Sequence, residues 1–422
     1  MRLLFSLFFC VALLPACFAQ TPPPADTLRL SLAQADSVFR QHNLLLLAGR
    51  FQVEASRAEA LQASLTANPT LTVEASAYNN ETRRVVDVGR QGQKVISIEQ
   101  LLATAGKRNK RVALAAQRTR LTELELLDLL RGLRYELRTR FYAIYFDQQT
   151  LQRFDQQRAM LQTTVAAYQT QYDRNNVSLR ELLRLRTLLF QLDNDRATLL
   201  GQLAENQQAL QTLLSTDRAV RPLTTDAELA RYTLPALPDD TLRQLALRNR
   251  PDVLVKNAET EEARLNYTLQ RALAVPDLQV GARYDQASDY IRNYVGVSLS
   301  ADIPLFNRNQ GAIRAARSQI AYQQQLAQQQ AIQVRNEVST ALQQVRAVEA
   351  RVQAVESTFT SQLEQLNQGV ITSFRRGNLT LIEFVDLVEA YTDSIQQLNR
   401  LKADRVGAYE SLSYRIGRDL FN

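Results

Sequence analysis

Two carboxylates near the C-terminal end of the chain are the side chains best placed to do chemistry. Glu383 and Asp386 are three positions apart, so a helix through them carries both on one face. Carboxylates gathered in this way attract cations and repel anions. Glu383 also completes a Thr-x-x-Glu capping box with Thr380, a structural role that is compatible with a charged one. The simpler role for Asp386 is a solvated position on the helix surface.

The residues needed for catalysis are missing from the sequence. His42 is the only histidine, and it stands beside Asn43 in a helical segment, where a surface or packing role is expected. Both cysteines, Cys10 and Cys17, precede residue 20. Therefore no nucleophile with its base, no set of converging metal ligands and no glycine-rich phosphate loop can be assembled. The sequence predicts a protein that is not an enzyme and holds no cofactor.

The formal net charge of +7 is compatible with nucleic-acid binding, but the distribution of charge is not. Arginines are scattered among carboxylates along the helical segments and form no basic block with interleaved aromatic residues. We interpret them as solvated helix faces. Nucleic acid is not an expected partner.

The first 19 residues have the layout of a secretory signal peptide. Arg2 precedes an apolar stretch over residues 3–14, and small residues end the segment at Ala19. A lipoprotein acylated at Cys17 is the alternative. Residues 20–30 follow as an extended leader whose consecutive prolines prevent helix formation. After residue 19, no apolar run approaches the ~18 residues that a membrane-spanning helix needs.

The chain repeats itself at a distance of about 200 residues, which indicates a duplicated folding unit. The matching segments are 61–71 with 269–278, 96–98 with 297–299, and the two capping boxes 177–182 with 379–384. We predict a first repeat over residues 31–215, a linker over 216–239 and a second repeat over 240–422. Each repeat is expected to run helix, two strands, long helix, tip and shorter helix.

Long helices dominate the predicted structure. Apolar residues recur at helical spacing over residues 31–65, 107–172, 240–273 and 309–374. Within residues 107–172 they recur every three or four positions and form a coiled-coil seam, and a leucine series follows from Leu182. At 1.5 Å per residue the longest helix spans on the order of 100 Å. The sequence therefore predicts a rod or tube rather than a globule.

Short alternating segments predict strands with one apolar and one polar face. Leu71 and Val73 alternate with Thr72 and Glu74, and residues 278–285 follow the same pattern. This alternation fits a sandwich strand, and it also fits a transmembrane β-barrel strand with lipid on one side and water on the other. Four such strands cannot close a barrel, so membrane strands would require several copies of the chain to share one. The predicted fold class is mainly α, with antiparallel coiled-coil helices forming an α-barrel and four strands contributing to a shared β-barrel.

Short motifs stand at the ends of these elements. They are Arg250-Pro251-Asp252-Val253, Pro276-Asp277-Leu278, Ala105-Gly106-Lys107-Arg108 and Pro304-Leu305-Phe306-Asn307-Arg308-Asn309-Gln310-Gly311. In this order, on a duplicated scaffold, they resemble the TolC-like outer-membrane factor family over essentially the whole chain after residue 19. The last motif looks most like the branch that exports cobalt, zinc, cadmium or copper cations.

The resemblance implies the outer-membrane exit channel of a tripartite efflux system. Three chains would form a homotrimer with a twelve-stranded barrel in outer-membrane lipid and a helical tunnel through the periplasm. It would conduct substrate passively from a periplasmic adaptor and an inner-membrane pump of the resistance-nodulation-division or a related class. The substrate stays open between metal cations and small amphiphiles. A type I secretion exit channel and a periplasmic coiled-coil adaptor or scaffold are the alternative functions.

The resemblance also implies two sites. Glu383 and Asp386 match the acidic pair that narrows the channel entrance, although the first repeat has Arg184 where the second has Asp386, so the two hairpins should contribute unequally. The hairpin tips would dock on the adaptor, and local packing is the alternative role of their aliphatic residues. The tip residues are Asn176, Val177, Ser178, Leu179, Asn378, Leu379, Thr380 and Leu381.

Overall fold

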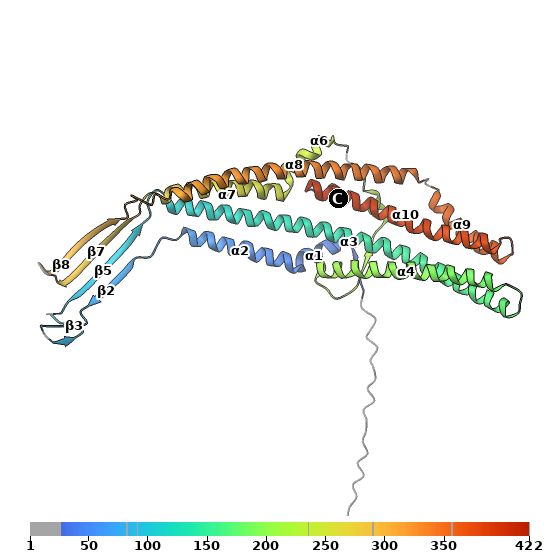
Figure 1. Cartoon of the computed structure of the whole chain (residues 1–422), viewed down its shortest axis with the longest axis horizontal. Helices are drawn as coiled ribbons and strands as arrows, with labels where there is room; N and C mark the ends of the chain where they lie inside the picture. Colours follow the sequence, from blue (N-terminus) through green and yellow to red (C-terminus); the bar gives the residue numbers. More distant parts are fainter. Residues whose placement is uncertain are drawn as a thin grey trace, which may run out of the picture.

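A computed structural model describes residues 27–421, except residues 82, 91, 235, 289–290 and 356–357. The predicted signal peptide and residues 20–26 of the leader lie outside the described residues. Figure 1 shows an elongated molecule with a β-sheet at one end, long helices along the middle and two helix-to-helix turns at the opposite end.

The elements follow the predicted order twice. The first half forms β1 (Leu28–Ser31), α1 (Leu32–His42), α2 (Leu44–Ser64), β2 (Thr70–Ala75), β3 (Tyr78–Asn79), β4 (Arg84–Val85), β5 (Lys94–Leu102), α3 (Lys107–Asp173) and α4 (Leu179–Leu214). The second half forms β6 (Val220–Leu223), α5 (Asp226–Ala230), α6 (Asp239–Asn249), α7 (Pro251–Leu273), β7 (Leu278–Ala287), β8 (Arg292–Ala301), α8 (Gln310–Ala354), α9 (Phe359–Arg375) and α10 (Leu381–Ile416). The predicted linker thus carries two elements, β6 and α5. The strand β6 pairs in parallel with β1 of the first half.

Local sequence signals explain where the helices start. Ser178 and Thr380 cap α4 and α10 through reciprocal capping boxes. The long helices α3 and α8 both begin after a residue in the left-handed conformation, Gly106 with φ 63° and Asn309 with φ 56°. Both residue types tolerate this conformation. The 67 residues of α3 span about 100 Å at 1.5 Å per residue.

Three helices that the sequence predicted as continuous are interrupted. Asn43 separates α1 from α2, because its side chain accepts from the Leu46 amide and caps a new helix. Pro251 starts α7 and disfavours helical backbone at Arg250, which ends α6. In the segment 309–374, α8 ends at Ala354 and α9 begins at Phe359. Neither proline nor glycine marks that last break, so apolar spacing alone could not show it.

Apolar clusters run along the helices. The predicted seam of α3 is buried at Leu137, Phe141 and Ile144, and Leu185 and Leu192 of α4 are buried as well. The largest cluster joins α3 to α8 and α10 in the middle of the molecule, another joins α1 to α3 and α4, and a third fills the space between the two hairpin tips. The helices are therefore held by packing along their length and not only at their ends.

A buried polar network ties the linker to both repeats. The Tyr232 hydroxyl donates to Glu410 Oε1 at 2.6 Å, and Arg138 donates to Glu410 Oε2 at 3.0 Å and to Asp419 at 2.7 Å. Burial raises the pKa of the Tyr232 phenol, and the neighbouring Glu410 raises it further. Tyr232 therefore stays a neutral donor, and the network is satisfied only when linker, α3 and α10 meet.

The main sheet is antiparallel in the order β2–β5–β7–β8. Its register places apolar residues in one row, for example Val73 opposite Ile96 and Tyr284 opposite Val295. The next row carries polar residues, and Ser97 lies opposite Arg283. The predicted alternation is therefore confirmed. Its apolar face is open to solvent in the single chain.

The same registers correct the predicted match between residues 96–98 and 297–299. Leu71 pairs with Ile98, and its equivalent Leu278 pairs with Ala301. Ile98 is therefore equivalent to Ala301 and not to Leu299. A shift by two residues leaves an alternating pattern unchanged, so the strand sequence alone could not detect it.

Candidate functional site

The two hairpin tips lie together at the end of the molecule far from the sheet (Figure 1). In the first tip, Glu181 Oε2 accepts from the Ser178 amide and hydroxyl, each at 2.7 Å. In the second tip, Glu383 Oε2 accepts from the Thr380 amide at 2.8 Å and from its hydroxyl at 2.7 Å. The predicted structural role of Glu383 is thus present.

These hydrogen bonds favour the charged form of both glutamates. The Ser178 amide and hydroxyl hold the pKa of Glu181 below its ordinary value. The Thr380 hydroxyl and amide do the same for the pKa of Glu383. Within one chain, Glu383 therefore stays ionised over the whole physiological range.

Asp386 is paired with the residue that replaces it in the other repeat. Arg184 Nη2 of α4 lies 3.6 Å from Asp386 Oδ1 of α10, and both side chains are about half exposed. Arg184 therefore pairs with Asp386 of the other repeat. The sequence carried a signal for this contact, because the repeat places an arginine and an aspartate at equivalent positions. The ion pair joins the two hairpins.

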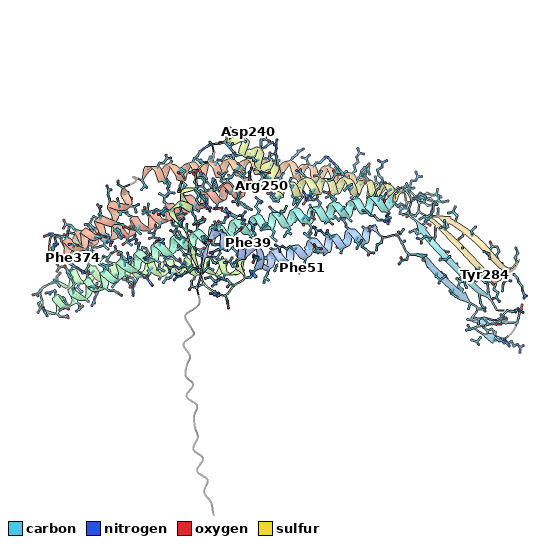
Figure 2. All side chains as sticks on the ribbon, turned by 180° about the vertical axis from the view of Figure 1, so that it is seen from behind. Phe39, Phe51, Asp240, Arg250, Tyr284 and Phe374 are labelled. Carbon is cyan, nitrogen blue, oxygen red and sulfur yellow. The ribbon has the colours of Figure 1, made fainter. Side chains whose placement is uncertain are left out.

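A dry core lies behind this ion pair. Phe384 and Val385 of α10 are buried against Leu185 and Leu188 of α4. Phe374 of α9 stacks on Phe384 with ring centroids 4.0 Å apart, and Figure 2 labels it at the tip end. Farther from the turns, the hairpins are joined by Arg153 with Glu364 and by Gln157 with Asn367. The tips therefore form one packed unit in which two carboxylates face solvent.

The predicted docking residues differ in exposure. Asn176, Ser178, Asn378 and Thr380 are exposed and polar, and Leu179 is 49% exposed. Val177, Leu379 and Leu381 are half-buried, and the last two pack against the tip core, as the local-packing alternative expected. Two exposed aliphatic residues were missed by the sequence analysis, Leu183 and Ile382. Leu183 and Ile382 lie near the starts of α4 and α10, where the spacing of apolar residues does not distinguish a buried position from an exposed one.

The Arg-Pro-Asp motif forms a clamp in the middle of the helices, where Figure 2 labels Arg250. The buried Arg250 donates to Asp252 at 2.6 and 3.0 Å, to Glu337 of α8 at 2.7 Å and to the Arg415 carbonyl of α10. Burial would raise the pKa of Glu337, but hydrogen bonds from Gln333, Arg250 and Arg415 outweigh it and lower the pKa to about 2. The motif thus holds α7, α8 and α10 together.

A second clamp lies where the sheet meets the helices. Lys107 is buried at the start of α3, and its ammonium group donates to Asp277 Oδ1 at 2.6 Å and to the Val275 carbonyl at 2.5 Å. The Thr104 amide donates to the same carboxylate oxygen at 2.9 Å. These contacts join the strand exit of the first repeat to the strand entry of the second.

The described residues contain no group of three or more histidine, cysteine, aspartate or glutamate side chains that could hold a metal ion. No helix in the described part of the chain combines the length and the hydropathy that a membrane crossing requires. His42 is an exposed residue at the end of α1.

Comparison with known proteins shows which proteins the chain resembles. The family model of the outer membrane efflux proteins matches residues 242–418, within the second repeat. The second repeat is therefore similar to the outer membrane efflux proteins. The chain is 24% identical over 362 residues to the cobalt-zinc-cadmium resistance protein CzcC of Cupriavidus metallidurans, which covers 85% of this chain and 82% of CzcC.

Solved structures share the fold over nearly the whole chain. CusC superimposes with a TM-score of 0.74 at 19% identity, covering 93% of this chain and 94% of CusC. The outer membrane protein VceC of Vibrio cholerae superimposes with a TM-score of 0.71 at 15% identity, covering 92% of this chain and 96% of VceC. The TolC-like fold predicted from the sequence is confirmed.

Proposed function

We propose that this protein is the passive exit duct of a tripartite efflux system, assembled as a homotrimer that spans the outer membrane and extends into the periplasm. The observation that carries the proposal is the four-stranded sheet. One of its faces is apolar and exposed, and its outer strands β2 and β8 have a neighbour on one side only within the described chain. Lipid would cover the apolar face, and further copies would pair with the free edges.

The test measures location and mass together. Membranes are fractionated, and the protein is extracted from the outer-membrane fraction into detergent for native mass measurement. A stable trimer in that fraction is expected, with conductance after insertion into planar bilayers. A protein released with the periplasm would instead support the adaptor or scaffold alternative, which does not need two amphipathic strand pairs.

The substrate proposed first is a metal cation. Similarity to CzcC, whose name describes cobalt, zinc and cadmium resistance, favours metal cations over small amphiphiles. The duct itself needs no tight metal site for this role, because it passes on what the pump and adaptor deliver. Growth of a deletion strain on a panel of metals and of amphiphilic dyes tests the substrate. Sensitivity to dyes alone would exclude the metal proposal, and failure to secrete a protein would support type I secretion.

The entrance proposed for the duct is the tip surface that carries Glu383 and Asp386. In a trimer each carboxylate would occur three times around the axis, and such rings favour cations. Replacing both residues by their amides should lower cation selectivity and weaken block by trivalent cations in planar bilayers. Glu181→Gln, which removes a capped glutamate of the same type from the first tip, is the matched control and should matter less. Unchanged selectivity in normally inserted trimers would leave the acidic pair with a capping and solvation role only.

The tips are also proposed to dock on the helical hairpin of a periplasmic adaptor. Leu179, Leu183 and Ile382 support this, because they expose aliphatic surface at an otherwise polar end. Ile382→Asp should abolish adaptor binding while trimers still form. The same substitution at the solvent-facing Ile332 of α8, which is similarly exposed, should leave adaptor binding unchanged.

A further inference from the structure

Five basic side chains lie at the end of the sheet far from the helices, where the strands are joined in pairs (Figure 1). Arg83, Arg84 and Arg90 lie between β2 and β5, Lys94 is the first residue of β5, and Arg292 is the first residue of β8. Lys94 is half-buried and the other four are exposed. No ion pair joins any of these five side chains to a residue that the structure describes.

The acidic residues of the same region do not balance this charge. Asp87 is 5% exposed and Asp285 7%, and each accepts from the backbone amide two residues further along the chain, at 3.0 and 3.2 Å. Glu81 is the one exposed carboxylate among the described residues of the two connecting segments, 76–93 and 288–291. The described surface at this end of the sheet therefore carries an excess of positive charge.

The two connecting segments lie side by side. The side-chain amide of Gln286 donates to the Gly89 carbonyl at 2.8 Å and joins the end of β7 to the segment before β5. Gly89 directly precedes Arg90 in the sequence. Ala287, the neighbour of Gln286, pairs with Arg292 across the β7–β8 ladder. Arg90 and Arg292 therefore belong to one region of the surface although they come from different repeats.

The β3–β4 hairpin is fastened to the same region. Asn79 pairs with Arg84 in the hairpin, and the Asn79 side-chain amide donates to Asp87 at 3.2 Å. The strands β2 and β5 pair up to Ala75 and Lys94, where this segment leaves the sheet. The arginines of the hairpin thus continue the positive charge that begins at Lys94.

Lys94 stands where the apolar face of the sheet ends. It alternates with Ile96 and Ile98 on β5, so its side chain lies on the apolar face. Lys94 pairs with Ala75, one row beyond the pair of Ile96 with Tyr284, which Figure 2 labels on the sheet. In membrane strands, aromatic residues and lysines with a long aliphatic stem mark the level at which hydrocarbon gives way to lipid headgroups. The five cations lie at or beyond that level.

We propose that these residues form a basic rim that binds the phosphate groups of a phosphorylated lipid in the outer leaflet of the outer membrane. This inference rests on the proposed function and adds a lipid site to it. Guanidinium groups bind phosphate with two parallel hydrogen bonds, and the lysine ammonium group adds a point charge. The basic rim consists of Arg83, Arg84, Arg90, Lys94 and Arg292.

Exposed aliphatic side chains in the same segment favour a lipid over free phosphate. Val85 is 75% exposed, Val86 54% and Val88 53%, and they alternate along the chain with the residues of the basic rim and with Asp87. Apolar groups beside cations suit an amphiphile, whose acyl chains contact the valines while its phosphates contact the cations. Inorganic phosphate would gain nothing from the valines.

Lipid binding to detergent-extracted trimers tests the basic rim. Native mass spectrometry compares three probes: diphosphoryl lipid A, its monophosphoryl form and phosphatidylcholine. Wild type should bind the diphosphoryl form most tightly and phosphatidylcholine least. The triple variant Arg83→Gln, Arg84→Gln and Lys94→Gln should bind diphosphoryl lipid A about 100-fold more weakly, because each cation near an anionic lipid surface contributes about a factor of five. Binding of phosphatidylcholine should not change.

Two further variants separate loss of charge from loss of structure. Arg83→Lys, Arg84→Lys and Lys94→Arg together keep all three charges and should bind diphosphoryl lipid A nearly as well as wild type. Lys94→Gln alone changes one residue and should weaken binding about 5-fold, which tests the rim if the triple variant does not assemble. Unchanged binding by Lys94→Gln and by the triple variant would overturn the proposal.

A matched control removes the same charge elsewhere. Arg248, Arg335 and Arg400 of α6, α8 and α10 are exposed, and no ion pair joins them to a described residue. Their combined replacement by glutamine should leave binding of diphosphoryl lipid A unchanged. If this control weakens binding as much as the rim variant, net charge and not the rim attracts the lipid, and the site is wrong.

The remaining outcomes distinguish this inference from the proposed function. Displacement of the lipid by inorganic phosphate at constant ionic strength would show a site for free phosphate and would overturn the lipid assignment. Trimers that conduct normally but bind all three probes equally would refute the lipid site and leave the duct intact. A protein recovered from the periplasm would instead refute the duct and the lipid site together.

Discussion

The ion pair between Arg184 and Asp386 predicts how the proposed entrance responds to charge. It connects α4 and α10 at 3.6 Å, with roughly half of each side chain exposed. An exposed pair of this kind contributes about 0.2–1 kcal/mol. If the entrance opens by parting the hairpins, a trimer loses three such pairs, or roughly 0.6–3 kcal/mol. The closed state is then favoured by about 3-fold to about 150-fold through these contacts.

Two single substitutions separate the contact from the charge. Arg184→Gln and Asp386→Asn both remove the ion pair, so both should raise the ratio of open to closed channels in planar bilayers by about 3-fold to about 150-fold. Arg184→Gln leaves Asp386 unpaired and should increase cation selectivity, whereas Asp386→Asn should decrease it. Raising the salt concentration from about 0.1 to about 1 M shortens the screening length from about 10 to about 3 Å and should reduce the difference between wild type and either variant.

The exchange Arg184→Asp with Asp386→Arg restores the ion pair with its polarity reversed and leaves the net charge unchanged. The open fraction should return close to the wild-type value. If both single variants open the channel and the exchange does not close it again, the effect comes from altered charge and not from the contact. If neither single variant changes the open fraction, the ion pair does not hold the entrance.

Three further predictions concern topology and the clamp of Arg250. Cysteines introduced within residues 79–91 or 285–292 should react with impermeant reagents on intact cells, because these segments join strands at the end of the sheet far from the helices; labelling only after permeabilisation would contradict this. Arg250→Met leaves two carboxylates without their shared partner and should lower the free energy of unfolding by about 2–4 kcal/mol. Circular dichroism should show this as a lower midpoint of thermal unfolding. As a control, Arg264→Met removes an exposed ion pair and should lower the free energy of unfolding by less than about 1 kcal/mol. Because the pKa of Glu337 is lowered from 4.5 to about 2, its contribution to stability is complete above pH 4.5 and is lost as the pH falls towards 2. The full shift corresponds to about 3 kcal/mol, which partial solvent access reduces to roughly 1–2 kcal/mol. The variant Glu337→Gln should therefore lose less stability than wild type between pH 5 and pH 2.5.

Features encoded by neighbouring residues were predictable from the sequence. The capping boxes at Ser178 and Thr380 start α4 and α10 where predicted, because a cap needs residues only three positions apart. The alternating strands and the seam of α3 were equally visible, since period 2 and period 3.6 are local properties. Duplication then supplied the order of elements, and with it the TolC-like fold.

Contacts between distant segments were decided only by the tertiary structure. Arg184 meets Asp386, Arg250 meets Glu337 and Lys107 meets Asp277 across 87 to 202 positions of sequence. No local pattern specifies which of the 50 basic and 43 acidic residues become partners, because charged residues on solvated helix faces share the same local sequence pattern. Only the packing of the helices brings particular pairs together.

The limits of periodicity explain the remaining differences. A two-residue slip leaves an alternating strand unchanged, so the equivalence of Ile98 with Ala301 needed the hydrogen-bonded register. Likewise, the apolar spacing continues through the break between α8 and α9, because spacing records which face is buried and not whether the backbone is continuous. The sequence by itself determined the repeated unit, its helices and the two-faced character of its strands. The tertiary structure decided the register, the helix breaks and the ion pairs, because each of these depends on residues that become neighbours only after the chain has folded.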